Sequence, residues 1–185
     1  MLVKDRDIDF GFVILAGDRN LAMIKSTLRS IGHHYEDVPT VCVVEKETKP
    51  AEMKELKKLC PVVKGKKTFT SLINAGVHKN KEWSLVIVEG SIVRKGLVAK
   101  YTRFLESYKD VMYPIVVDYD GQGRPVDLHT EFYNSSINGL LIHKAMLKEV
   151  GDFGDEPLEM ARVLWATRAL ARDVQFKAIL GTRLT

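Results

Sequence analysis

The chain has 185 residues, of which 45% are hydrophobic and 28% are charged. This length predicts a single domain over residues 1–185, and the composition excludes a disordered chain, a collagen and a coiled coil. The net charge of +4 is a modest excess that fits an anionic ligand such as a nucleotide. It lacks the concentrated basic stripe with interleaved aromatic residues that marks a nucleic-acid partner.

The sequence shows no membrane or export signal. The longest apolar stretch, Phe12–Ala16, is far too short to span a membrane, and Met1–Asp9 lacks the apolar core of a secretory signal. Cys42 and Cys60 have no metal-binding spacing, which favours free thiols in a reducing compartment. We therefore expect a cytoplasmic protein.

Strand and helix patterns alternate along the chain. Short apolar runs predict buried strands, and apolar residues three and four apart predict helices. Strands are expected at Phe10–Leu15, Thr40–Val44, Pro61–Val63, Leu85–Val88, Met112–Val117 and Val126–Phe132, with a short apolar run at Gly139–Ile142. Helices are expected over Leu21–Ile31, from Pro50 through Leu59, and over Thr70–His78, Leu97–Tyr108, Lys144–Val150 and Leu158–Leu170, before a last apolar segment at Val174–Leu180.

Polar residues and glycines mark the boundaries of these elements. Asp18 or Asn20 is expected to cap the first helix, and Gly32 is expected to end it. Gly151 is expected to end the helix at Lys144–Val150, and Asp118–Arg124 has the composition of a turn.

The repeated strand–helix units predict an α/β fold, a mostly parallel twisted sheet with helices on both faces. Ligands of such sheets bind beyond the carboxyl ends of the strands. The segments at those ends are Ala16–Asn20, Glu45–Thr48, Glu89–Ser91 and Asp118–Arg124.

The first of these segments joins a strand to a helix. The free N–H groups of a helix N-terminus suit a phosphate, which Ala16 and Gly17 would let approach and Arg19 would bind. The alternative is a plain connection in which Asp18 caps the helix.

Two acids follow later strands. Glu45 could accept hydrogen bonds from ribose hydroxyls, or it could be a solvated loop acid. Glu89 is a candidate metal ligand or acceptor for sugar hydroxyls, and Ser91 could add a hydroxyl group.

A pair of aspartates provides a second candidate metal site. Asp118 and Asp120 would point to the same face of an extended strand and could bind Mg²⁺ or Mn²⁺ through nucleotide phosphates. The alternative is a polar hairpin turn.

Two further groups of charges have both a functional and a structural interpretation. Glu156 and Glu159 share one face of the last helix, where either could be a general base or simply favour the helix dipole. Lys64, Lys66 and Lys67 form a solvated loop or a loop that faces phosphate.

Four stretches, in this order, resemble the GT-A glycosyltransferases, especially the large inverting family that synthesises or decorates polysaccharides. Phe12–Ile31 resembles its first strand, polar turn and helix, and Val43–Glu45 resembles its second strand ending in an acid. Leu72–Ser91 resembles its stretch from an asparagine, here Asn74, into the DxD motif, and Glu149–Glu159 resembles its Glu-Val-Gly-Gly-Phe turn with the acids that follow.

The resemblance implies a nucleotide-diphosphosugar donor and a hydroxyl acceptor such as a glycan. It implies that Ala16, Gly17, Asp18, Arg19 and Glu45 line the nucleoside, with Asn74 near it. It also implies that Glu89 takes the place of the first DxD aspartate, and that Glu159, or else Glu156, stands where the family has its base.

The sequence also departs from the family pattern. Glu89-Gly90-Ser91 lacks the second carboxylate of the DxD, so the use of Mn²⁺ or Mg²⁺ and the activity itself are open. A non-catalytic domain on the same scaffold, binding a sugar nucleotide, a glycan or a protein, is one alternative. Another is a sugar nucleotidyltransferase, which Val13–Lys25 resembles without that family's second glycine.

Overall fold

The computed structural model describes residues 9–17, 20–108, 115–119, 137–180 and 184. Its elements, in chain order, are β1 (Phe10–Ala16), α1 (Leu21–His34), β2 (Thr40–Glu45), α2 (Pro50–Leu56), β3 (Val62–Gly65), α3 (Phe69–Lys79), β4 (Trp83–Val88), α4 (Leu97–Glu106), β5 (Ile115–Tyr119), β6 (Leu141–His143), α6 (Lys144–Val150), α7 (Leu158–Leu170) and β7 (Phe176–Leu180). None of the helices among these residues is long and apolar enough to cross a membrane.

The strands form one seven-stranded sheet in the order β3-β2-β1-β4-β6-β5-β7. All neighbouring pairs are parallel except the two that involve β6, which runs antiparallel to β4 and to β5. This arrangement confirms the predicted mostly parallel α/β sheet. The chain moves outward from β1 to β2 and β3 on one side and then returns to place β4 on the other side of β1.

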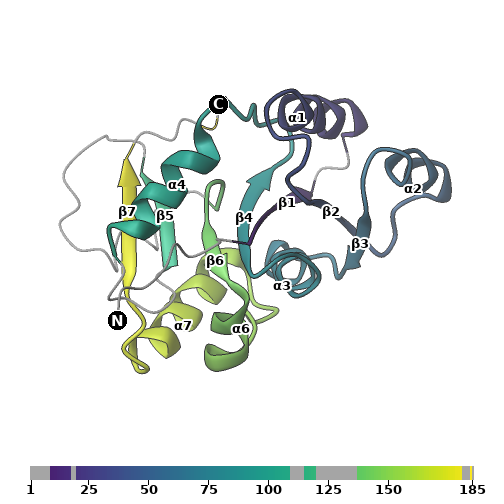
Figure 1. Ribbon diagram of the computed structural model, residues 1–185. Helices are drawn as coiled ribbons and strands as arrows, with labels where there is room; N and C mark the ends of the chain where they lie inside the picture. The colour runs from purple at the N-terminus through teal and green to yellow at the C-terminus, as the bar shows by residue number, and fades with distance from the viewer. Residues whose placement is uncertain (1–8, 18–19, 109–114, 120–136, 181–183, 185) are drawn as a thin grey trace.

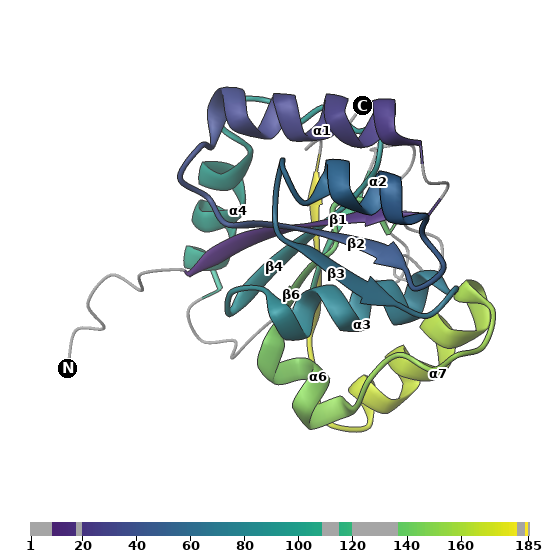
Figure 2. The same ribbon diagram turned by 90° about the vertical axis from the view of Figure 1, so that its right-hand side faces the viewer.

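Helices cover both faces of this sheet (Figures 1 and 2). One face packs its apolar side chains against α3, α6 and α7, where Trp165, Ile73 and Leu72 are almost completely buried. The opposite face packs against α1, α2 and α4. The central strand β1 is buried along its whole length, as its continuous apolar run predicts.

One glycine sets how closely α3 approaches the sheet. A Cβ atom on Gly76 would lie 2.3 Å from Val13 Cγ1 and 2.9 Å from Val43 Cγ2. Because both valines lie in central strands, only a residue without a side chain fits at this point of α3. The close contact holds the second half of α3 against β1 and β2.

Several predicted boundaries are wrong. Helix α1 runs through Gly32 to His34, and it ends at Tyr35, whose ring packs 5.7 Å from that of Phe12. Helix α2 ends at Leu56, so Leu59 lies beyond it and is exposed. Asp118 belongs to β5 and not to a turn, because β5 pairs with β7 as far as Tyr119. The strand predicted at 126–132 lies outside the described residues.

Candidate functional site

The order of the strands marks one place at the carboxyl edge of the sheet. From β1, the chain continues to β2 on one side, and β4 lies on the other side. Such a reversal leaves a crevice between the two connections, beyond the ends of β1 and β4. Gly17 follows β1 and Glu89 follows β4, so both residues lie where the topology predicts the crevice.

The turn after β1 has little free space. A Cβ atom on Gly17 would lie 2.6 Å from Phe69 Cζ, so the ring at the start of α3 packs directly against the glycine backbone. Ala16 is fully buried at the end of β1. Asp18 and Arg19 lie outside the described residues, so their predicted roles stay predictions. The Phe69 ring therefore covers the face of Gly17 on which a side chain would lie.

Asn20, rather than Asp18, caps helix α1. Its Oδ1 atom accepts hydrogen bonds from the backbone N–H groups of Ala22 and Met23, at 3.1 and 3.2 Å. Two of the backbone N–H groups that the sequence analysis assigned to a phosphate therefore already donate hydrogen bonds to Asn20. Phosphate binding at this turn would depend on the glycine backbone and on Arg19 more than on the helix N-terminus.

Glu45 is the last residue of β2, and only 6% of its surface is exposed. Side chains alternate along a strand, so Glu45 lies on the same face as Val43, which packs toward α3. The backbone carbonyl of Glu45 accepts hydrogen bonds from Thr48 N–H and from its hydroxyl group, which fixes the turn after the strand. A buried carboxylate at a strand end is costly to desolvate unless it has hydrogen-bond donors.

Glu89 and Ser91 are held in a turn directly after β4. Gly90 has a left-handed φ of +89°, and its N–H donates to Thr27 Oγ1 of α1 at 2.9 Å. Ser91 Oγ accepts a hydrogen bond from Asn138 Nδ2, and Asn138 Oδ1 accepts one from Val88 N–H. Glu89 is 5% exposed, so the turn presents a buried carboxylate that is fixed from both α1 and the start of β6.

The charge of Glu89 acts toward α1 and β2. Hydrogen bonding with Cys60 and burial raise the pKa of the Cys42 thiol, and the Glu89 carboxylate adds to that shift. Cys42 lies on β2 beside Ile14 of β1 and packs toward α1 and α2. The Glu89 carboxylate is therefore close enough to Cys42 to influence the pKa of its thiol.

The two candidate metal sites lie after different strands, and whether either binds a metal stays a prediction. Strand β6 separates β4 from β5, which puts Asp118 about 10 Å from the line of β4 at ordinary strand spacing. Asp120 lies outside the described residues. Within the described part of the chain, no three His, Cys, Asp or Glu side chains are grouped to hold a metal ion.

Asn74 has a structural partner that sequence reasoning did not foresee. Its Nδ2 donates to the Phe153 carbonyl at 2.8 Å, and its Oδ1 accepts from Phe153 N–H at 3.1 Å. Phe153 stacks on Trp165 of α7, with ring centroids 4.5 Å apart. The amide of Asn74 thus fixes the connection between α6 and α7 against α3.

The same connection is pinned at further points. Trp165 Nε1 donates to the Gly151 carbonyl at 2.7 Å, and Arg168 donates to the Asp152 carbonyl at 2.6 Å. Lys66 forms an ion pair with Asp155 at 2.5 Å, which ties the end of β3 to the segment just before α7. Figure 2 shows this segment at the edge to which the arrowheads of β2 and β3 point.

The two acids near the start of α7 are both exposed. The predicted shared helix face is wrong, because α7 begins at Leu158 and Glu156 precedes its cap, Pro157. Glu156 bends back over the connection, since a Cβ atom on Gly154 would meet its carboxylate oxygen. Glu159 lies in the first turn of α7 and interacts electrostatically with Arg162. Burial lowers the pKa of the Arg162 guanidinium, and the Glu159 carboxylate opposes that shift.

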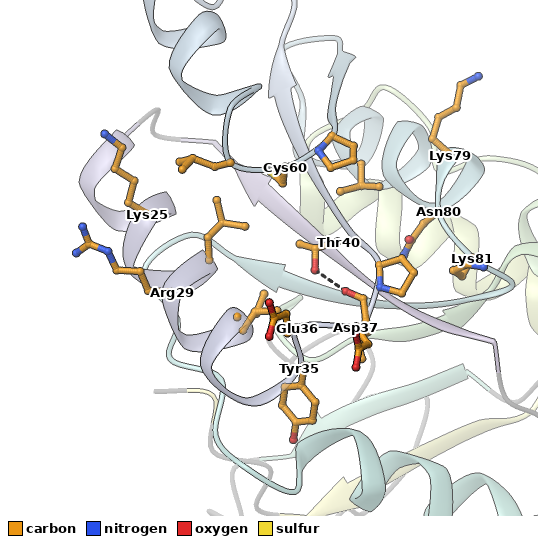
Figure 3. Close-up of a pocket in the computed structure, with 18 residues that line it drawn as sticks. Lys25, Arg29, Tyr35, Glu36, Asp37, Thr40, Cys60, Lys79, Asn80 and Lys81 are labelled. Atoms are coloured by element: carbon orange, nitrogen blue, oxygen red, sulfur yellow. Dashed lines mark hydrogen bonds between the residues drawn. The ribbon is translucent and has the colours of Figure 1, made fainter.

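A cavity of about 820 Å³ lies at the opposite, amino edge of the sheet. Figure 3 shows Lys25 and Arg29 of α1 on one side of it, with Lys79 and Lys81 on the other. Lys25 pairs with Glu55 at 2.9 Å, and Lys81 pairs with Asp9 at 3.2 Å. Much of this charge is thus neutralised, and the cavity lies away from the crevice beside β1 and β4.

Comparison with solved structures identifies the architecture. The chain matches no protein-family model and no curated protein sequence. Its structure is similar to S. aureus TarS 1–349 (TM-score 0.64, 14% identity, 92% of this chain and 57% of that chain). It is similar to glucosyl-3-phosphoglycerate synthase from Mycobacterium tuberculosis (0.63, 12%, 92% and 70%) and to the mannosyltransferase PcManGT from Pyrobaculum calidifontis (0.65, 13%, 95% and 55%). The chain has the GT-A fold.

These GT-A structures hold nucleotide ligands. TarS 1–349 has been solved with UDP-GlcNAc, the synthase with Mn²⁺, UDP and glucosyl-3-phosphoglycerate, and PcManGT with GDP-Man and Mn²⁺. The present chain spans 57% of TarS 1–349, so a large part of that protein has no counterpart in it. The likeness confirms the predicted GT-A architecture.

Proposed function

We propose that this chain is a glycosyltransferase that moves a sugar from a nucleotide-diphosphosugar donor to a hydroxyl group of a glycan or similar acceptor, with inversion. The observation that carries this proposal is the pair of buried acids, Glu45 and Glu89, on either side of Gly17 in a GT-A fold. The two carboxylates follow the strands on either side of β1, where the hydroxyl groups of a donor's ribose and sugar could donate hydrogen bonds to them.

The donor would bind across the end of β1. Glu45 would accept hydrogen bonds from the ribose hydroxyls, and the nucleotide would pass the backbone of Gly17 beside the Phe69 ring. Arg19 would add a charged donor for the diphosphate. Asn74 would act indirectly, because its amide holds Phe153 in place. Ser91 would offer the donor only its hydroxyl group, whose oxygen already accepts a hydrogen bond from Asn138.

A divalent cation fits these residues poorly. Glu89 is the one carboxylate that the described residues place at the end of β4, since Asp118 belongs to β5, two strands away. Mg²⁺ or Mn²⁺ at Glu89 would need most of its ligands from the diphosphate and from water. We therefore assign no step of the reaction to a metal.

The chemistry proposed for the acceptor uses the start of α7. Glu159 takes the proton from the acceptor hydroxyl, whose oxygen attacks the anomeric carbon as the bond to the nucleoside diphosphate breaks. The leaving diphosphate takes the electron pair of that bond, and nearby cationic side chains stabilise its charge. The connection fixed by Asn74 and Lys66 would hold the base in position.

A matched pair of variants tests this assignment. Glu159→Gln should lower transfer at least about 100-fold, the usual contribution of a general base, and leave nucleotide affinity unchanged. Glu156→Gln, three residues earlier on the same surface, serves as the control and should retain transfer within about threefold. Transfer that survives Glu159→Gln would refute Glu159 as the base, and loss in Glu156→Gln alone would reassign the role.

A non-catalytic sugar-nucleotide-binding domain is the second candidate, favoured by the single carboxylate at the end of β4. It predicts a nucleotide-dependent thermal shift without transfer or donor hydrolysis by the wild-type protein. A sugar nucleotidyltransferase differs again, since it would release pyrophosphate from a nucleoside triphosphate and a sugar phosphate. Product analysis therefore separates the three functions.

A further inference from the structure

A groove of about 490 Å³ runs along α3, on the side that faces the connection between α6 and α7. Lys46, Lys64 and Lys66 border it at the ends of β2 and β3, and His78 borders it on α3. Asp152 and Asp155 form the opposite wall. The groove borders α3, which Figure 2 shows on the lower side of the sheet.

The groove carries unbalanced positive charge. Lys66 pairs with Asp155 at 2.5 Å, and the His78 ring contacts Asp152 at 2.7 Å, so both wall acids have partners. Neither Lys46 nor Lys64 forms an ion pair within the described residues, and Lys64 Nζ reaches only the Lys46 carbonyl at 3.4 Å. Two ammonium groups at one end of a groove suit a doubly charged anion.

Hydrogen bonds within the protein hold the walls of the groove in place. Ser71 Oγ accepts from Lys66 N–H at 2.9 Å, which fixes the turn from β3 into α3. The two hydrogen bonds between Asn74 and Phe153 hold the opposite wall to α3. The backbone of the groove therefore loses little conformational freedom when a ligand binds. A smaller loss of conformational entropy favours a higher affinity.

The position of the groove separates it from the diphosphate of the donor. Strand β3 lies three places from β4 in the sheet, or about 14 Å at ordinary strand spacing. The donor diphosphate is expected near Glu89, after β4. The groove instead borders Gly154, just before the acids that begin α7.

We propose that this groove binds a phosphate group of the acceptor, carried at a distance from the hydroxyl that receives the sugar. The identity of the ligand as an acceptor rests on the proposed glycosyl transfer. Anion binding in the groove rests only on Lys46, Lys64 and the fixed walls. The acceptor class it selects is a phosphate-bearing glycan or polyol.

Titration with inorganic phosphate at constant ionic strength, followed by amide NMR shifts, tests the groove. We expect saturable binding, with shifts at Lys66, Ser71 and Gly154. Lys46→Ala/Lys64→Ala should weaken that binding at least about fivefold. The control Lys57→Ala/Lys58→Ala removes the same charge from exposed positions after α2 and should change it less than twofold. NMR shifts that do not saturate with phosphate would overturn the site. Phosphate affinity that falls equally in both double variants would overturn it as well.

A second titration, in saturating UDP or GDP, identifies the source of the phosphate. If the affinity for phosphate is unchanged by the nucleotide, the result supports binding of an acceptor phosphate. If the nucleotide displaces phosphate, the groove belongs to the donor site, and the assignment to the acceptor is overturned. The two proposals fail differently. Nucleotide binding without phosphate binding refutes the groove alone, and phosphate binding without any nucleotide binding refutes the proposed function and leaves the anion site.

Discussion

Replacing Asn74 with alanine separates a positioning role from a ligand-binding role. The substitution removes two hydrogen bonds, of 2.8 and 3.1 Å, between α3 and the Phe153 backbone. Each typically contributes about 0.5–1.5 kcal/mol, and the Phe153 N–H and carbonyl would be left without their side-chain partner. We expect the free energy of unfolding to fall by about 1–3 kcal/mol.

Urea denaturation of the wild type and of Asn74→Ala measures this loss directly. His78→Ala is the control, since it removes an exposed contact with Asp152 in the same connection and should cost less than about 1 kcal/mol. If Asn74 positions the connection, glycosyl transfer falls while nucleotide affinity is kept. Unchanged stability together with a tenfold loss of nucleotide affinity would refute this reasoning and place Asn74 against the nucleoside.

Three further predictions follow from contacts elsewhere in the fold. Gly76→Ala should lower the free energy of unfolding by about 1–3 kcal/mol because its Cβ would overlap Val13, whereas Gly32→Ala, with open space around it, should raise it by about 0.5–1 kcal/mol. Equal effects in urea denaturation would contradict the tight packing of α3. Burial lowers the pKa of His143, whose Nδ1 caps α6, so the unfolded chain binds more protons as pH falls below 6.5. Stability should then decline from pH 6.5 to the folded pKa, and His143→Asn should remove that decline; parallel pH profiles would argue against it. Mn²⁺ alone should leave the melting temperature unchanged, because Glu89 is its one described ligand at β4; a shift lost in Glu89→Ala would show a resident metal site.

Local sequence patterns predicted the parallel half of the sheet well. The apolar runs that became β1, β2 and β4 are long enough to indicate buried strands, and Pro50 begins a helix as expected. The same strand ends located Gly17, Glu45 and Glu89, because the place of a ligand in such a sheet follows from its topology.

Long-range contacts explain what the sequence did not show. The three-residue strand β6 owes its direction to pairing with β4, more than fifty residues earlier in the chain. The role of Asn74 depends on Phe153, 79 residues away. Gly32 has no local requirement for a left-handed backbone, so packing of Tyr35 decides where α1 ends. Arg162 and Asn138 were missed for the same reason.

Thermal unfolding with nucleoside diphosphates and their sugars tests the central claim, a donor site between β1 and β4, most directly. A ligand at 100 times its dissociation constant adds about 2.7 kcal/mol, which corresponds to a shift of about 5–10 °C for a chain of this size. We predict such a shift with one nucleotide and its loss in Glu45→Ala or Glu89→Ala. The Lys57→Ala/Lys58→Ala control should keep the shift. A flat response to every nucleotide, or a shift that survives both acid substitutions, would contradict a donor site at this edge of the sheet.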